Sequence, residues 1–275
     1  MGFNCGIVGL PNVGKSTLFN ALTKSSIPAE NYPFCTIDPH MAITEVPDPR
    51  LDKLATIYGS KKIIPSNVSF VDIAGLVKGA AAGEGLGNQF LSTIREVDLV
   101  LHVLRCFEDS DIVHTVGEID PICDYETIVA ELMLKDLESV EKRQQKIPSL
   151  IKRVQGPEKK ALEEELNVLE QIHAALDAGD APKVRTLVLK HEMHTLQLLC
   201  SKNSLVIANI SEDDITTYES NPHYQKVVEY FGKDRVIAVS AKIEHELSQI
   251  EPEDAQEMMD MLGLEEPSLN TIIRQ

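Results

Sequence analysis

The sequence predicts an α/β fold: a mainly parallel β-sheet with helices on both faces, and an α-helical segment inserted into it. Two observations support this prediction. Apolar segments alternate with helical patterns through the first 122 residues, which is typical of parallel strands joined by helices. From about residue 124 to 202, charged segments with leucines at helical spacing replace the strand patterns. We therefore expect an α/β domain made of 1–123 and 203–275, and a helical coiled-coil domain over 124–202.

The individual elements follow from local patterns of apolar residues. The runs expected to form strands are Phe3–Leu10, Met41–Val46, Val68–Ile73, Leu99–Arg105, Ser204–Ile210 and Arg235–Ser240. Helical patterns occur at Ser16–Thr23, Arg50–Ile57 and Gln89–Val97. In the insertion, segments 128–137 and 162–169 predict an antiparallel pair of long helices. Gly156 and Pro157 predict the turn at its tip, and Pro148 predicts a kink or a break before it.

Charge and cysteine content narrow the class of protein. The net charge is −17, so the whole molecule repels nucleic acid and anionic membranes, and any RNA contact needs a local basic patch. Five cysteines without a C-x-x-C pair favour reduced thiols over disulfides or a zinc site. No apolar run reaches membrane-spanning length, and no leader pattern precedes the first strand. We expect a cytoplasmic monomer with no membrane partner and no sequence-specific DNA binding.

A phosphate-binding loop follows the first expected strand. Residues 9–17 read GLPNVGKST, which fits G-x-x-x-x-G-K-[ST] between an apolar segment and an amphipathic helix. Backbone N–H groups of such a loop point at an anion, and the helix N-terminus adds its positive dipole. Lys15 is expected to bridge the β- and γ-phosphates, and the Ser16 hydroxyl to bind Mg²⁺. The loop residues expected to bind nucleotide are Asn12, Val13, Gly14, Lys15, Ser16 and Thr17.

Further residues are expected near the phosphates. Asp72 and Gly75 match D-x-x-G at a strand end, so the carboxylate would hold Mg²⁺ through water and the Gly75 N–H would contact the γ-phosphate. Thr36 stands in a loop before the second strand, where its hydroxyl would complete the Mg²⁺ shell; a solvated loop threonine is the alternative. The glycine-rich segment after Asp72 is interpreted as a switch loop that orders when γ-phosphate is present.

The residues expected to read the base differ from those of a guanine site. Guanine-specific sites use N-K-x-D, in which the Asp accepts two hydrogen bonds from guanine and the Lys packs over the ring. Here the strand end at Asn209 reads NISE, with Ile210 in place of the cation and Glu212 one methylene longer than Asp. Losing such polar pairing removes a discrimination of roughly 10⁴–10⁵. We therefore expect ATP to be preferred over GTP, with Ser240 and Ala241 offering backbone N–H groups to the base.

These motifs together resemble the YchF family, the Obg-like ATPases. The resemblance rests on GLPNVGKST, NYPFCTIDP, the glycine-rich DIAGLVKGAAAGEGLGNQF (72–90) and N-x-x-E at 209–212, and it covers essentially the whole chain. It implies a P-loop GTPase-type fold that hydrolyses ATP, a helical coiled-coil insertion, and association with the ribosome or the translation and stress-response machinery. Family members also carry a C-terminal TGS domain, which we expect to be missing from this chain because it stops at Gln275.

The placement of the catalytic water needs a separate explanation. In Ras-like enzymes a Gln after D-x-x-G orients the water, but position 76 is Leu. The resemblance points to His114 as the catalytic substitute, because an imidazole of pKa ~6.5 can orient or deprotonate water; an ordinary loop histidine is the alternative. Asn12 resembles the residue that holds K⁺ in potassium-stimulated relatives. His102, within a strand, is expected to be a packed core side chain.

A local reversal of charge marks the expected tip of the insertion. Between positions 142 and 160, seven basic residues stand against the single acid Glu158. This segment either binds RNA phosphates or forms a solvated helix face.

The sequence thus predicts a Mg²⁺-dependent, ATP-hydrolysing switch protein that acts with the ribosome or ribosomal RNA. Two alternatives remain. One is a GTPase with an unrecognised guanine site. The other is a nucleotide-gated binding module with negligible turnover, which would follow if Leu76 leaves the water unplaced.

Overall fold

The computed structural model describes residues 3–24, 40–73, 86–109 and 118–275. The chain divides into two compact units. The first consists of Met1–Gly75, Val97–Tyr125 and Ser204–Gln275, and the second of Leu76–Glu96 and Glu126–Asn203. Of the described residues, 86–96 group with the helical unit in this division, whereas the sequence predicts them within the α/β domain. The expected domain boundaries themselves stay a prediction.

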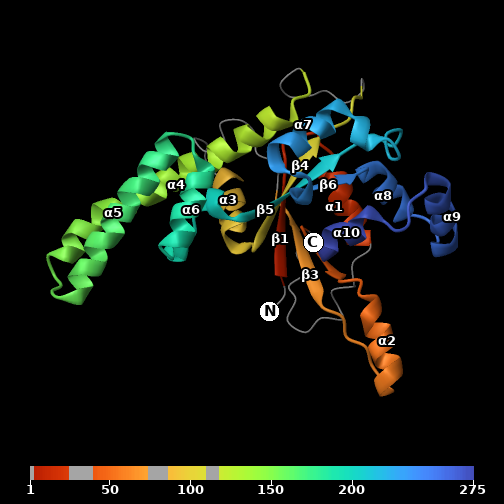
Figure 1. Cartoon of the computed structure of the whole chain (residues 1–275), viewed down its shortest axis with the longest axis horizontal. Coiled ribbons are helices and arrows are strands. Elements are labelled where there is room, and N and C mark those ends of the chain that lie inside the picture. Colours follow the sequence, from red (N-terminus) through yellow and green to blue (C-terminus); the bar gives the residue numbers. More distant parts are fainter. Residues whose placement is uncertain (1–2, 25–39, 74–85, 110–117) are drawn as a thin grey trace. The chain divides into compact units, whose positions relative to one another are not determined.

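Within the described residues of the first unit, six strands form one sheet in the order β2-β3-β1-β4-β5-β6 (Figure 1). They are β1 (Phe3–Val8), β2 (Met41–Glu45), β3 (Asn67–Asp72), β4 (Leu99–Arg105), β5 (Asn203–Asn209) and β6 (Val236–Val239). β1 pairs in parallel with β3 and β4, and β5 with β6, whereas β2 is antiparallel to β3. The mainly parallel sheet is therefore confirmed, and the expected strand ends are shifted by at most two residues.

Several helices also belong to the first unit. They are α1 (Lys15–Lys24), α2 (Pro49–Tyr58), α7 (Pro222–Phe231), α8 (Ala241–Leu247), α9 (Pro252–Leu262) and α10 (Ser268–Arg274). Local sequence explains where α2 begins and ends. The Asp48 carboxylate accepts a hydrogen bond from the Arg50 N–H, Pro49 takes the first helical position, and Gly59 ends the helix with a φ of 61°. The same kind of cap begins α7, where Asn221 accepts from two backbone N–H groups.

The central strands bring their carboxyl ends to one edge of the sheet. β4 is buried along nearly its whole length, as expected of a parallel strand covered on both faces. Its residue Leu104 packs with Val206 and Ala208 of β5 and with Val227 of α7. β4 and β5 also end side by side, because the Cys106 N–H donates to the Asn209 carbonyl over 2.8 Å. In open α/β sheets, ligands bind at this edge.

The second unit is helical. It contains α3 (Leu86–Glu96), α5 (Pro157–Asp177), α6 (Ala181–Lys190) and most of α4 (Pro121–Ile151), with the short 3₁₀ helices η3 (Met193–Leu196) and η4 (Leu199–Ser201). α4 and α5 run antiparallel, as expected (Figure 1). Val140 and Ile147 of α4 pack with Leu169 and Ile172 of α5 in a shared apolar core. The buried Asp136 carboxylate accepts hydrogen bonds from the Leu199 and Cys200 N–H groups, which joins η4 to α4.

The tip of this helix pair agrees with the sequence in one respect and differs in another. Gly156 precedes α5 with a φ of 65°, a conformation that glycine adopts without strain, and Pro157 begins the helix. The expected turn is therefore confirmed. A break at Pro148 is wrong, because α4 continues to Ile151. Pro148 cannot donate to the carbonyl four residues before it, and the helix ends three residues after it.

Of the helices in the part of the chain that the structure describes, none is long and apolar enough to cross a membrane.

Candidate functional site

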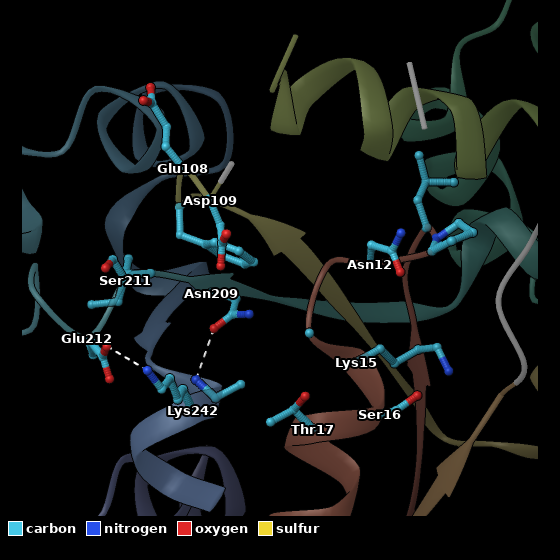
Figure 2. Close-up of a pocket in the computed structure, with 16 residues that line it drawn as sticks. Asn12, Lys15, Ser16, Thr17, Glu108, Asp109, Asn209, Ser211, Glu212 and Lys242 are labelled. Carbon is cyan, nitrogen blue, oxygen red and sulfur yellow. Dashed lines mark hydrogen bonds and ion pairs between the residues drawn. The ribbon is translucent and has the colours of Figure 1, made fainter. Parts of the chain in front are cut away.

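A cavity of about 680 Å³ lies at the carboxyl edge of the sheet. Four segments line it: the loop between β1 and α1, the residues after β4, the residues after β5, and the start of α8. In the view of Figure 2, Lys15, Ser16 and Thr17 lie on one side, and Glu212 and Lys242 lie on the other. The expected phosphate-binding residues and the expected base-reading residues therefore face the same space.

The phosphate loop depends on a glycine at position 14. Gly14 has a φ of 92°, a region that side chains rarely adopt. A Cβ built there would lie 2.1 Å from the Nδ2 atom of Asn209. Space and backbone conformation therefore both require glycine. Asn12 adopts a φ of 64° in the same loop and lines the cavity, whereas the buried Val13 is absent from the lining.

Lys15 and Asp72 form an ion pair at the phosphate end of the cavity. Lys15 is the first residue of α1 and is 8% exposed; its ammonium contacts Oδ1 of Asp72, the last residue of β3. Ser16 and Thr17 line the cavity beside Lys15. Hydroxyl and carboxylate oxygens are ligands that suit Mg²⁺, which usually needs only one or two carboxylates in addition to substrate phosphates. The described residues contain no group of three or more His, Cys, Asp or Glu able to hold a metal. The donor set at Ser16 and Asp72 therefore fits a metal held partly by the nucleotide.

Asn209 connects the two ends of the site. Its Nδ2 donates to the Val13 carbonyl over 2.8 Å, and its Oδ1 accepts from the Ala241 N–H over 2.9 Å. Both bonds are buried. The side-chain amide thus fixes the phosphate loop against the start of α8, and the Ala241 N–H expected to contact a base is already used within the protein. The Ser240 hydroxyl is buried and has no hydrogen-bond partner among the described residues.

The end of the cavity where the base is expected to bind combines a buried apolar residue with an exposed ion pair. Ile210 follows β5, is 4% exposed, and packs in the core with Tyr224 while also lining the cavity. The Glu212 Oε1 atom lies 2.6 Å from the Lys242 Nζ atom (Figure 2). This hydrogen bond raises the pKa of Lys242, so the ammonium stays protonated.

Comparison with known proteins shows the family. The family model described as "50S ribosome-binding GTPase" matches residues 4–151. A "Ribosome-binding ATPase YchF" of Haemophilus influenzae is 49% identical over 280 residues, which cover all of this chain and 75% of that protein. The chain belongs to the YchF family. The Bacillus subtilis protein of the same name is 45% identical over 278 residues, again with 75% of its length covered. The solved structure of the "Schizosaccharomyces pombe YchF GTPase" matches 99% of this chain and 74% of its own, with a TM-score of 0.80 and 37% identity.

The structure adds residues to this YchF site that the sequence analysis missed. Phe107, Glu108 and Asp109 follow β4 and line the cavity. Ser211, which follows β5, lines it as well. Arg105, which is 1% exposed, holds the segment after β4 in place: its Nε donates to the Phe107 carbonyl over 3.1 Å, and its guanidinium lies 4.6 Å from the centre of the Phe107 ring. The position of these residues in the sequence could have identified them, because residues after the carboxyl ends of parallel strands line the ligand crevice.

Three expected site residues, Thr36, Gly75 and His114, lie outside the described residues, as does nearly all of the expected switch loop. His102 is described, and its expected place in the core is confirmed. It is 3% exposed and meets the Tyr125 ring edge-on at 4.9 Å. Burial, with a smaller effect from the Arg235 charge, lowers the pKa of His102 to about 3. His102 is therefore a neutral core side chain, and it does not line the cavity.

Proposed function

We propose that this YchF protein binds Mg²⁺ and ATP in the cavity between the phosphate loop and α8, hydrolyses the nucleotide, and acts with the ribosome. Hydrolysis of a nucleoside triphosphate follows from membership of the family. The choice of base rests on one observation above all: Ile210 is buried and apolar, and Glu212 is paired with Lys242, at the end of the cavity where a guanine site needs a cation over the ring and a free carboxylate. ATP is therefore the better fit.

The names of the relatives do not decide whether the nucleotide is ATP or GTP. The bacterial relatives are called ATPases, and the solved fission-yeast structure is called a GTPase. The residues of this chain provide the stronger argument. Phe107 and Ile210 supply apolar surface in the same cavity, on which the flat face of a purine can pack. Ile210 carries no charge with which to replace the missing lysine, so the remaining polar contact of the base falls to the region of Glu212.

The phosphates would be held at the other end of the cavity. The Lys15 ammonium and the backbone N–H groups at the start of α1 offer positive charge there. Ser16, Thr36 and Asp72 would hold Mg²⁺, which neutralises charge on the phosphates when bound. Asn12 is a candidate K⁺ ligand beside them.

The test of the base is a direct comparison. ATP and GTP dissociation constants and steady-state phosphate release are measured on the native chain with Mg²⁺. We expect tighter binding and faster turnover with ATP. Equal or GTP-favouring affinity would support a GTPase with a guanine site elsewhere in the cavity, and ATP binding without multiple turnover would support a nucleotide-gated binding module.

We propose His114 as the residue that orients the attacking water, because Leu76 has no polar group with which to do so. Replacement of His114 by Ala should reduce hydrolysis by roughly 10²–10⁴, the usual contribution of a general acid or base. ATP affinity should stay close to native. A variant with native turnover would remove His114 from the reaction and direct attention to K⁺ beside Asn12.

Ribosome association is proposed from the relatives' names and from the basic segment 142–160. Arg143 and Lys159 in that segment pair with Glu165 and Glu163. Among the described residues, Lys146, Lys152, Arg153 and Lys160 have no ion-pair partner, so their charge is available to an anionic surface such as RNA.

The test of this surface uses ribosome binding over a range of salt concentrations. Affinity should fall steeply with salt, because each neutralised phosphate releases counterions. Replacing Lys152, Arg153, Lys159 and Lys160 by Gln should lower both the affinity and the salt slope, while hydrolysis by the free protein is unchanged. Native binding by the quadruple variant would show that the segment is a solvated helix face.

A further inference from the structure

We propose that Lys242 is a specificity-determining residue, which favours adenine over guanine by holding one oxygen of the Glu212 carboxylate. The proposal rests on the proposed function in one respect: it takes the base to bind at the Glu212 end of the cavity. It goes further in assigning part of the base preference to a residue outside the N-x-x-E segment.

The two residues come from separate loops that a third residue fixes together. Glu212 lies three residues beyond the end of β5, and Lys242 is the second residue of α8. The bond between Asn209 Oδ1 and the Ala241 N–H, 2.9 Å long, joins these loops directly beside the pair. Glu212 Oε1 and Lys242 Nζ then lie 2.6 Å apart, and both residues line the cavity (Figure 2). The pair is therefore placed by a buried hydrogen bond, although its own atoms reach solvent.

The contact with Lys242 changes how the Glu212 carboxylate can bind a base. A carboxylate accepts two parallel hydrogen bonds only when both oxygens face the same donor pair. Here the Lys242 ammonium already donates to Oε1, so a second donor at that oxygen would lie against a positive charge. The pair thus offers a donor, Lys242 Nζ, next to an acceptor, the remaining Glu212 oxygen.

This donor and acceptor match one purine and mismatch the other. Adenine carries the N1 acceptor next to the N6 amino donor, which is the complementary arrangement. In the same pose, guanine presents the O6 acceptor where adenine has its N6 donor, and the N1–H donor where adenine has its N1 acceptor. The guanine N1–H would then meet the ammonium, and O6 would meet the carboxylate. A buried or partly buried polar group without a partner is costly, and such mismatches are an efficient source of discrimination.

The ion pair has little importance for stability, which makes its role in binding measurable. The Lys242 and Glu212 side chains are 62% and 40% exposed, and exposed ion pairs contribute little to folding. The chain contains a matched control in Lys233 and Glu219, whose Nζ and Oε1 atoms lie 2.9 Å apart on the same unit, away from the residues that line this cavity.

The test measures the ratio of GTP to ATP dissociation constants at low salt, for the native chain and for Lys242→Met, with Lys242→Gln as a second uncharged variant. We expect the ratio to fall by roughly two- to fivefold, the range in which an exposed ion pair acts. Lys242→Arg, which keeps a cation beside Glu212, should keep the preference for ATP. Lys233→Met should leave the ratio unchanged.

A double-mutant cycle separates this role from a general effect of charge. In a Glu212→Ala background, Lys242→Met should change the ratio by a smaller factor than in the native chain, because the carboxylate that Lys242 holds is gone and only the direct contact of the ammonium with the base is lost. An equal effect in both backgrounds, or a native ratio in Lys242→Met, overturns the role of Lys242 alone. Equal affinity of the native chain for ATP and GTP overturns the proposed base preference itself.

Discussion

Replacing Asn209 by Ala tests whether this residue connects the site or reads the base. The substitution removes the bonds to the Val13 carbonyl and the Ala241 N–H, and it leaves both backbone groups buried. An unsatisfied buried group costs about 1–3 kcal/mol. Because the space left by the amide lies at the edge of a cavity, some water will reach it, and we expect a loss of about 2–4 kcal/mol in the free energy of unfolding.

The nucleotide measurement decides between the two roles. If Asn209 positions the phosphate loop, Asn209→Ala should weaken ATP and GTP by the same factor, because both nucleotides share the phosphates. Asn209→Asp should keep the acceptor for Ala241, but it would place a carboxylate oxygen against the buried Val13 carbonyl, so its loss of stability should be at least as large as that of Asn209→Ala.

Urea unfolding, followed by circular dichroism, measures the stability, and isothermal titration measures both affinities. Asn221→Ala is the control: that side chain caps α7 and donates to the Cys106 carbonyl, outside the cavity lining, so stability should fall without any change in nucleotide affinity. The reasoning is refuted if Asn209→Ala retains native stability, or if it changes ATP affinity while leaving GTP affinity unchanged.

Three further outcomes are expected. Lys15→Ala should abolish phosphate release and weaken triphosphate binding by about 1.5–3 kcal/mol, as for a charged hydrogen bond; native turnover in this variant would exclude the phosphate loop from catalysis. Asp136→Ala should destabilise the helical unit by about 2–4 kcal/mol, because one buried and one part-buried N–H group of η4 lose their acceptor; faster hydrogen exchange at Leu199 and Cys200 would show it directly. His102 has a folded pKa of about 3, below the unfolded value, so the unfolded state binds more protons between about pH 3 and 6.5 and stability falls as pH falls through that window. From pH 8 to pH 5 this group should cost about 2 kcal/mol, and urea unfolding of His102→Phe should show a correspondingly flatter dependence on pH.

Much of the fold could be predicted because the signals are local. Alternation and length identify β4, whose predicted and observed bounds coincide, and Gly156-Pro157 marks a turn through backbone chemistry alone. The break expected at Pro148 is wrong because the helix continues for three residues beyond it, and the kink stays a prediction. The antiparallel pairing of β2 depends on tertiary contacts. The start of α7 had a visible cap at Asn221, which the sequence analysis did not use.

The chemistry of the site could be predicted from the sequence better than its geometry. The motif at 9–17 identifies the loop, and strand ends identify the edge of the sheet. The bond between Asn209 and Val13 spans 196 positions of the chain, so no local pattern reveals it. The same holds for Arg105: a buried charge at the end of an apolar strand becomes intelligible only once the Phe107 carbonyl and ring are seen to satisfy it. The positions of Thr36, Gly75 and His114 stay predictions.

The contact between Lys15 and Asp72 has a thermodynamic consequence. The cation proposed to bind phosphate and the carboxylate proposed to bind metal neutralise each other in this contact. A triphosphate that takes the lysine releases the carboxylate, and a metal that takes the carboxylate releases the lysine. The first ligand to bind therefore breaks the ion pair, and the second binds without that cost. By linkage, each ligand raises the affinity for the other by the same factor. With these roles, the site is selective for the metal–nucleotide complex over either component.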